Sequence, residues 1–178
     1  GAVVDNVGTM LNLYEALHGA PVTEKYLSVV GEVKEPIMLK VPIGTPITEC
    51  IAAANPTIRD YGIILGGPMM GKAIANLDAT TVKGSSSLLY LTAEQTVRGV
   101  ESACIRCGKC AEACPMGLEP FLLQKYARNS MFDELEENAV QDCIECGCCL
   151  YSCPANIPLL DIIRLAKGDV IKIIRTRK

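Results

Sequence analysis

The sequence predicts an α+β fold in two parts, a small domain of strands and one helix at residues 23–91 and an α-helical domain at residues 92–178. Three observations lead to this prediction. Short runs rich in β-branched residues, separated by turn residues, fill the first region. In the second region apolar residues recur at helical spacing, and a pattern of closely spaced cysteines is written twice.

Composition limits the class of protein. The 178 residues are 49% hydrophobic and 21% charged, which is enough apolar material for a buried core. A net charge of −3, an aromatic content of 4% and the absence of Trp argue against a nucleic-acid partner, which would select a basic face and stacking rings. No apolar run reaches the roughly 18 residues that a membrane-spanning helix needs, so we expect no transmembrane segment.

Residues 1–22 are predicted to be the tail of a domain whose other parts lie upstream. The chain begins without a Met or a targeting segment, as a piece of a longer protein would. Thr9 is expected to cap a short helix that Gly19 and Pro21 end. A single helix cannot bury its own apolar face, so we expect it to pack on the next domain or on upstream chain.

Residues 23–91 are predicted to form a strand hairpin, a helix and further strands, a pattern that suggests a small β-grasp. The helix is expected to open at Thr45, with Pro46 at its first position, and to stop at Asn55 and Pro56. Strands are predicted at residues 25–33, 37–41, 61–65 and 88–91, with a further one at 70–75.

A glycine-rich stretch at residues 66–72 (GGPMMGK) needs a separate interpretation, because it follows a strand and fits the phosphate-loop pattern G-x4-G-K. Ala73 stands where such a loop has the hydroxyl that holds Mg2+, and the polar residues after it indicate a turn instead of a helix N-terminus. We therefore expect a tight turn without nucleotide binding, with Met69 and Met70 as packing residues.

The second region is predicted to be helical. Thr92 and Gln95 form a capping box that opens a short helix leading to the cysteines. Apolar periodicity predicts helices across residues 118–126 and 132–139, and a last helix that breaks near Gly168. The apolar positions of that last helix are Leu159, Ile163, Ala166, Val170 and Ile173, and its final cations, which suit a solvated helix C-terminus, are Lys172, Arg175, Arg177 and Lys178.

The cysteine pattern C-x2-C-x2-C-x3-C-P occurs at residues 104–115 and again at residues 143–154, with the same Ile, Gly and Pro at corresponding places. Three thiolates so close on one loop suit the irons of a [4Fe–4S] cluster, and in two-cluster ferredoxins the fourth cysteine of each run ligates the other cluster. We therefore predict crossed ligation. Cluster 1 is assigned Cys104, Cys107, Cys110 and Cys153, and cluster 2 is assigned Cys143, Cys146, Cys149 and Cys114.

Two other chemistries use clustered cysteines and remain alternatives. Zinc favours separated cysteine pairs, and disulfides are rare in reducing compartments, while nothing here resembles a secretory signal. A Rieske centre is excluded, because it needs two imidazoles and the chain has only His18. Cys148 aligns with Lys109, between two ligands, and Cys50 stands alone in a predicted helix, so both are predicted not to be ligands.

The two cysteine runs, together with GGPMMG at residues 66–71 and VPIGTP at residues 41–46, resemble the C subunit of the Rnf complex, the membrane-bound, ion-translocating ferredoxin:NAD+ oxidoreductase. The resemblance covers essentially the whole chain. It implies a soluble-ligand-binding β-grasp (SLBB) domain followed by an all-α ferredoxin domain, with the eight assigned cysteines holding two [4Fe–4S] clusters. It also implies partners among the other subunits, membrane subunits included, with ferredoxin as a further candidate, and a peripheral place on the cytoplasmic side of the bacterial plasma membrane.

The resemblance further implies an upstream domain that binds FMN and NADH. Residues 1–10 (GAVVDNVGTM) look like its last strand and turn, in which Asn6 and Asp5 match positions that approach FMN. The glycine-rich loop and the nicotinamide contacts of that domain lie in sequence that this chain lacks. FMN and NADH are therefore expected in the full-length protein only, and the fragment alone is expected not to be catalytic.

The predicted function is electron transfer. NADH chemistry moves a hydride whereas each cluster passes one electron, so a flavin must stand between the two. The chain would carry single electrons between that flavin site and other carriers. Two alternatives stay open, a cobalamin-reductase-like subunit of a bacterial microcompartment and a structural docking module in which clusters act as staples.

Overall fold

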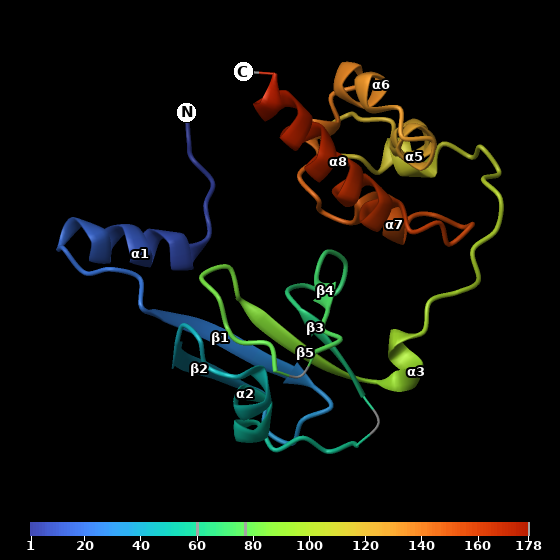
Figure 1. Cartoon of the computed structure of the whole chain (residues 1–178). Coiled ribbons are helices and arrows are strands. Elements are labelled where there is room, and N and C mark those ends of the chain that lie inside the picture. Colours follow the sequence, from blue (N-terminus) through green and yellow to red (C-terminus); the bar gives the residue numbers. More distant parts are fainter. Residues whose placement is uncertain (60, 77, 178) are drawn as a thin grey trace. The chain divides into compact units, whose positions relative to one another are not determined.

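The computed structural model describes residues 1–59, 61–76 and 78–177. It divides the chain into two compact units, Gly1–Val97 and Arg98–Lys178 (Figure 1). Each unit has its own hydrophobic core. The first unit holds a five-stranded mixed sheet, and the regular elements of the described part of the second unit are helices. The chain thus combines strands and helices as its residue patterns predict.

The sheet of the first unit has the strand order β2-β1-β5-β3-β4. Strands β1 and β5 run parallel, and the other neighbouring pairs are antiparallel. Alternation along β1 buries Leu27 and Val29 while Tyr26 stays exposed, the period of two that a strand requires. The predicted strand at residues 70–75 shortens to β4. The bounds are β1 (Glu24–Gly31), β2 (Ile37–Pro42), β3 (Tyr61–Leu65), β4 (Lys72–Ala73) and β5 (Ser87–Thr92).

Helix α2 (Ile47–Ala53) packs into the core of this unit, and Cys50 is a buried core residue as predicted. The predicted cap is wrong. The hydroxyl of Thr45 donates to the carbonyl of Pro42 at 2.8 Å and so closes the turn that leaves β2, while Pro46 takes the N-cap position. Helix α3 (Ala93–Thr96) carries the predicted capping box, in which the Gln95 N–H donates to the Thr92 hydroxyl at 3.2 Å and the Thr92 N–H donates to the Gln95 side chain at 2.9 Å.

Helix α1 (Val7–Leu17) begins earlier than predicted, because Asn6 caps it in place of Thr9. The Oδ1 atom of Asn6 accepts a hydrogen bond from the Gly8 N–H at 2.8 Å. None of its residues is buried, and apolar side chains such as Tyr14 and Leu17 are exposed. Of the two expected arrangements, packing on the next domain is therefore not made within the described residues, and packing on upstream chain stays a prediction.

The glycine-rich stretch at residues 66–71 is a tight turn, as predicted. Gly66 has a φ of +107°, and the Gly71 N–H donates to the carbonyl of Gly67 at 2.7 Å. A Cβ at Gly71 would lie 2.4 Å from Cγ2 of Ile64, so the turn folds back closely on β3. Strand β4 follows, and among the described residues no helix N-terminus is present here to receive a phosphate.

Gly31, at the end of β1, brings two strands closer than a larger side chain allows. Its φ is +108°, and a Cβ there would lie 2.1 Å from the carbonyl oxygen of Tyr90. We expect Gly31→Ala to lower the free energy of unfolding by at least about 2 kcal/mol, because backbone strain and a main-chain clash add together. Gly84→Ala is the control, since a Cβ there meets nothing within 4 Å. Denaturant unfolding followed by circular dichroism compares them, and equal stabilities would contradict this close approach.

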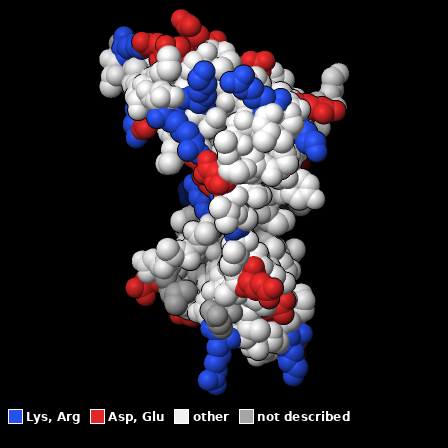
Figure 2. All heavy atoms as spheres, turned by 90° about the vertical axis from the view of Figure 1, so that its right-hand side faces the viewer, with Lys and Arg blue, Asp and Glu red and all other residues white. Residues whose placement is uncertain are grey.

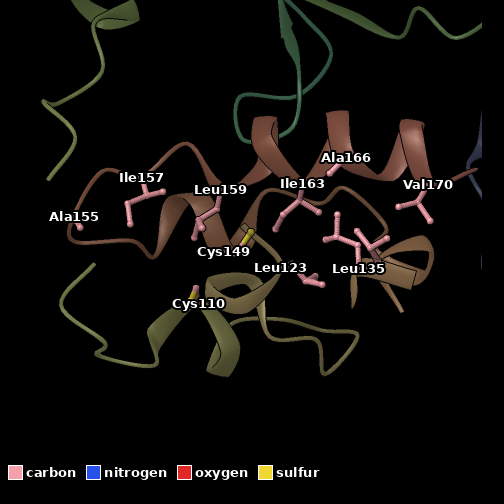
Figure 3. Packing of buried hydrophobic residues seen from close by; sticks show 11 residues of the cluster. Cys110, Leu123, Leu135, Cys149, Ala155, Ile157, Leu159, Ile163, Ala166 and Val170 are labelled. Atoms are coloured by element: carbon pink, nitrogen blue, oxygen red, sulfur yellow. The ribbon is translucent and has the colours of Figure 1, made fainter. Parts of the chain in front are cut away.

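The core of the second unit lies between its longest helix, α8 (Leu159–Thr176), and the shorter helices facing it. Ile163, Ala166 and Val170 project from α8 toward Leu123 and Leu135, and the same cluster contains Cys110 and Cys149 (Figure 3). The other helices are α4 (Lys109–Glu112), α5 (Pro120–Arg128), α6 (Phe132–Glu137), the 3-10 turn η1 (Val140–Asp142) and α7 (Cys148–Tyr151).

The predicted break near Gly168 is wrong, because α8 continues through it to Thr176. One glycine costs a helix only about 1 kcal/mol, and burial of Ala166 and Val170 on either side favours the unbroken helix. The end of α8 is tied down by Arg177, whose guanidinium contacts both Asp133 and Glu136 at 2.7 Å. The predicted cation Lys178 lies outside the described residues. In the part of the chain that the structure describes, no helix combines the length and the apolar character needed to cross a bilayer.

Candidate metal centres

The two cysteine loops adopt the same backbone conformation. The residue before the second cysteine of each run is left-handed, with φ of 56° at Arg106 and 55° at Glu145. The glycine after that cysteine is left-handed as well, with φ of 77° at Gly108 and 82° at Gly147. A non-glycine residue in this region is uncommon, so its occurrence at corresponding places shows that the sequence repeat is also a structural repeat.

The repeat continues beyond the loops. Gly108 and Gly147 cap the short helices α4 and α7, which lie against each other and carry the third cysteine of each run on a buried face. The fourth cysteines, Cys114 and Cys153, follow these helices, and each carbonyl accepts from the N–H three residues on, at 3.2 Å, in a turn closed by a left-handed Gly117 or Asn156. Helices α5 and α8 then begin at corresponding positions.

Two cavities lie against the loops, and each draws cysteines from both copies. The larger, about 550 Å3, is lined by three cysteines of the first run and the last of the second, namely Cys104, Cys107, Cys110 and Cys153. The smaller, about 20 Å3, is lined by three cysteines of the second run and the last of the first, namely Cys143, Cys146, Cys149 and Cys114. The structure therefore brings the eight cysteines together in the two sets that crossed ligation requires.

The donor set suits iron–sulfur clusters. All ten cysteines are free thiols. Among the described residues, no group of three Cys, His, Asp or Glu side chains converges on a position for one metal ion. Each set supplies four thiols, the number that a [4Fe–4S] cluster needs, since each thiolate binds a different iron. The smaller cavity must widen to admit a cluster, because about 20 Å3 holds roughly one water molecule. Apolar side chains complete the walls, among them Phe121 and Leu159 in the larger cavity and Leu123 and Ile163 in the smaller.

Burial raises the pKa of several of these thiols. It raises the pKa of Cys110 and Cys143, and it raises the pKa of Cys149 to about 12. Because the charged form is the thiolate, desolvation favours the neutral thiol. These side chains therefore stay protonated at neutral pH until a cation replaces the proton.

Assembly of the clusters should consequently depend on pH. Cysteine binds iron as the thiolate, so binding releases a proton from each ligand. Below a raised pKa the thiolate fraction grows about tenfold for each pH unit. We expect anaerobic reconstitution of the apo-chain to be roughly tenfold faster or more at about pH 9 than at about pH 7. The growth of visible absorption measures the reconstitution rate. Cys148→Ala is the control, and its rate should depend on pH in the same way. A reconstitution rate independent of pH would contradict this prediction.

Cations and one carboxylate surround the second loop, a feature that spacing alone did not predict. Lys167 donates from Nζ to the carbonyl of Cys143 at 2.7 Å, and Arg164 donates from Nε to a carboxylate oxygen of Glu145 at 2.7 Å. Both cations are mostly buried, with 19% and 17% of the side chain exposed. In the sequence, the one sign that the two loops differ in their charged surroundings is the opposite charge of Arg106 and Glu145 at the same place in the aligned repeats.

The remaining candidate residues lie elsewhere. Cys148 is half-buried and lies beside Cys146. A hydrogen bond with the Cys146 side chain is the main cause of the raised pKa of Cys148. Cys148 does not line either of the two cavities described above. Asn6 and Asp5 are exposed in the first unit, where Asn6 caps α1 and the Asp5 carboxylate accepts from the Asn6 N–H at 2.7 Å.

Comparison with known families defines the class of protein. A model of the SLBB domain matches residues 26–73, and a model of the 4Fe-4S dicluster domain matches residues 96–154. The chain therefore joins an SLBB domain to a 4Fe-4S dicluster domain, and the second match contains the two cysteine runs.

Three curated relatives match nearly the whole chain. The chain is 41% identical to the C subunit of the Na(+)-translocating ferredoxin:NAD(+) oxidoreductase complex of Acetobacterium woodii, over 96% of this chain and 39% of the relative. It is 41% identical to the C subunit of the ion-translocating oxidoreductase complex of Rhodobacter capsulatus, over 94% and 33%, and 39% identical to that of Haemophilus influenzae, over 100% and 28%. The chain is similar to these C subunits along nearly its whole length, and it spans about a third of the length of these relatives.

Proposed function

We propose that the chain is the electron-carrying part of an ion-translocating ferredoxin:NAD+ oxidoreductase. The observation that carries the proposal is the pair of cavities, each lined by three cysteines of one run and the fourth of the other. We assign a [4Fe–4S] cluster to each. When bound, these clusters supply one-electron redox chemistry. The names of the relatives favour this function over that of a cobalamin-reductase-like subunit.

The protein residues would position and insulate the clusters. Helices α4 and α7 lie against each other, which supports a short distance between the two sites. Buried Leu123 and Ile163 keep water from the second site, and a buried site strengthens the electrostatic effect of neighbouring charges. Lys167, which holds the carbonyl of Cys143, would fix the loop and place a positive charge near cluster 2.

The two units would have separate roles. Strand order β2-β1-β5-β3-β4 with one helix against the sheet supports a β-grasp of the SLBB type for the first unit, with the domain at residues 23–91. The helices around the cysteines support an all-α ferredoxin domain at residues 92–178. Residues 1–22 would complete an upstream domain that binds FMN and NADH, where Asn6 and Asp5 approach the flavin. The whole protein would lie peripherally on the cytoplasmic side of the plasma membrane, against the other subunits, with ferredoxin as a further partner.

A redox titration tests electron transfer against the docking-module alternative. Anaerobically prepared chain would be titrated with dithionite and followed by EPR. We expect two interacting signals that appear and disappear reversibly, because each cluster takes up one electron. Clusters that stay silent over the range accessible to dithionite would contradict the proposal and leave them a structural role.

A further inference from the structure

The second copy of the repeat pairs its two cations with one carboxylate. Arg164 donates to Glu145 at 2.7 Å, and Nζ of Lys167 lies 3.6 Å from the other oxygen of that carboxylate. When the cysteines are aligned, the residues of the first copy that correspond to Glu145, Arg164 and Lys167 are Arg106, Lys125 and Arg128. An arginine therefore stands where the second copy has its carboxylate.

The first copy leaves two of these charges unmatched. Arg106 and Lys125 line the same cavity of about 550 Å3, and in the described part of the chain neither forms an ion pair. Arg128 turns away to Glu101, at 2.5 Å. Like charges at one cavity repel unless an anion lies near them. Figure 2 shows several Lys and Arg side chains on the displayed face of this unit, interspersed with Asp and Glu.

The negative charge of a bound cluster does not account for this difference, since both sites would hold the same kind of cluster. The second copy meets that charge with two cations that share a carboxylate, whereas, among the residues described, Arg106 and Lys125 at the first cavity share none. The first copy thus has a surplus of positive charge that points outward to a further anion.

The first site is also the more open of the two. Cys104 and Cys107 are exposed, while their counterparts Cys143 and Cys146 are half-buried. Phe121 on α5 is 36% exposed, whereas the corresponding Leu160 on α8 is 2% exposed. Ile105 is a second exposed apolar side chain beside the cysteines of the first copy, and its counterpart Ile144 is exposed as well. Apolar side chains with charges beside them resemble a protein interface with its polar rim.

We propose that this face, formed by Ile105, Arg106, Phe121 and Lys125, docks a protein carrier of single electrons whose own redox centre is surrounded by acidic residues. A carboxylate of that partner takes the place that Glu145 holds in the second copy. Cluster 1 is then the point at which electrons pass between this chain and the carrier. Cluster 2 is the farther of the two clusters from the carrier. The inference rests on the proposed function and adds the docking site and the charge of the partner.

The test is electron transfer between the cluster-loaded chain and a small acidic ferredoxin, measured by stopped flow at several salt concentrations. We expect the second-order rate to fall as salt rises, and Arg106→Glu combined with Lys125→Glu to lower the low-salt rate roughly tenfold or more, because charge reversal removes electrostatic steering. Arg106→Lys should keep most of the rate. Arg175→Glu is the matched control, an exposed cation elsewhere in the same unit.

Three further measurements separate failure of the docking site from failure of the proposed function. Iron content and EPR confirm that each variant holds both clusters, and loss of clusters in the unmodified chain would reject the proposed function itself. With clusters intact, a rate that is insensitive to Arg106 and Lys125, or a loss explained wholly by a shifted midpoint potential of cluster 1, overturns the docking site. Binding to phosphatidylglycerol vesicles that depends on the same two residues, without an effect on the ferredoxin rate, overturns it in favour of a membrane contact.

Discussion

Cys114→Ala and Cys143→Ala are expected to remove the same cluster, although the two residues belong to different cysteine runs. Both line the smaller cavity, together with Cys146 and Cys149. Loss of one of four thiolates should leave that cluster unstable, so each variant should retain about four irons from the other cluster. Anaerobic iron analysis and EPR of the reduced proteins measure this result, and the spectra of the two variants should match.

Cys104→Ala and Cys153→Ala form the complementary pair, since both line the larger cavity. Their common EPR spectrum should differ from that of the first pair, because the two sites have different charges around them. Cys148→Ala is the control, expected to keep both clusters. Spectra that group Cys114 with Cys104, in place of Cys143, would reject crossed ligation.

Leu159→Ala is expected to lower the free energy of unfolding of the second unit by about 2–5 kcal/mol. Leu159 is 1% exposed at the start of α8 and belongs to the core drawn in Figure 3. Truncation there removes buried methyl groups and leaves a cavity that the surrounding helices fill only in part.

Leu165→Ala is the matched control on the same helix, because Leu165 is 73% exposed. It should change stability by less than about 0.5 kcal/mol. Anaerobic urea unfolding followed by circular dichroism compares the two variants in the cluster-loaded state. Similar losses for both would mean that α8 does not present its apolar stripe to this core.

The features best predicted from the sequence are those in which nearby residues decide the outcome. The capping box of Thr92 and Gln95 formed as expected, because both members belong to one turn. The turn at residues 66–71 was recognisable from its glycines and from Ala73, which lacks the hydroxyl of a phosphate loop. The cysteine spacing likewise identified two equivalent loops.

The features that sequence reasoning missed depend on contacts between distant segments. Helix α8 runs through Gly168 because buried neighbours on both sides outweigh a local preference. Thr45 and Thr9 had the residue type of a cap, yet Thr45 bonds back to Pro42 and Asn6 caps α1. The contact of Lys167 with the carbonyl of Cys143 joins α8 to the second cysteine loop, and α7 lies between them in the sequence. A local sequence pattern does not predict such a contact.

The metal content of the anaerobically purified chain tests the central claim most directly. We predict about eight irons and eight acid-labile sulfides per chain, as two [4Fe–4S] clusters require, and no zinc. A chain that holds zinc and lacks labile sulfide would contradict the assignment of both cavities.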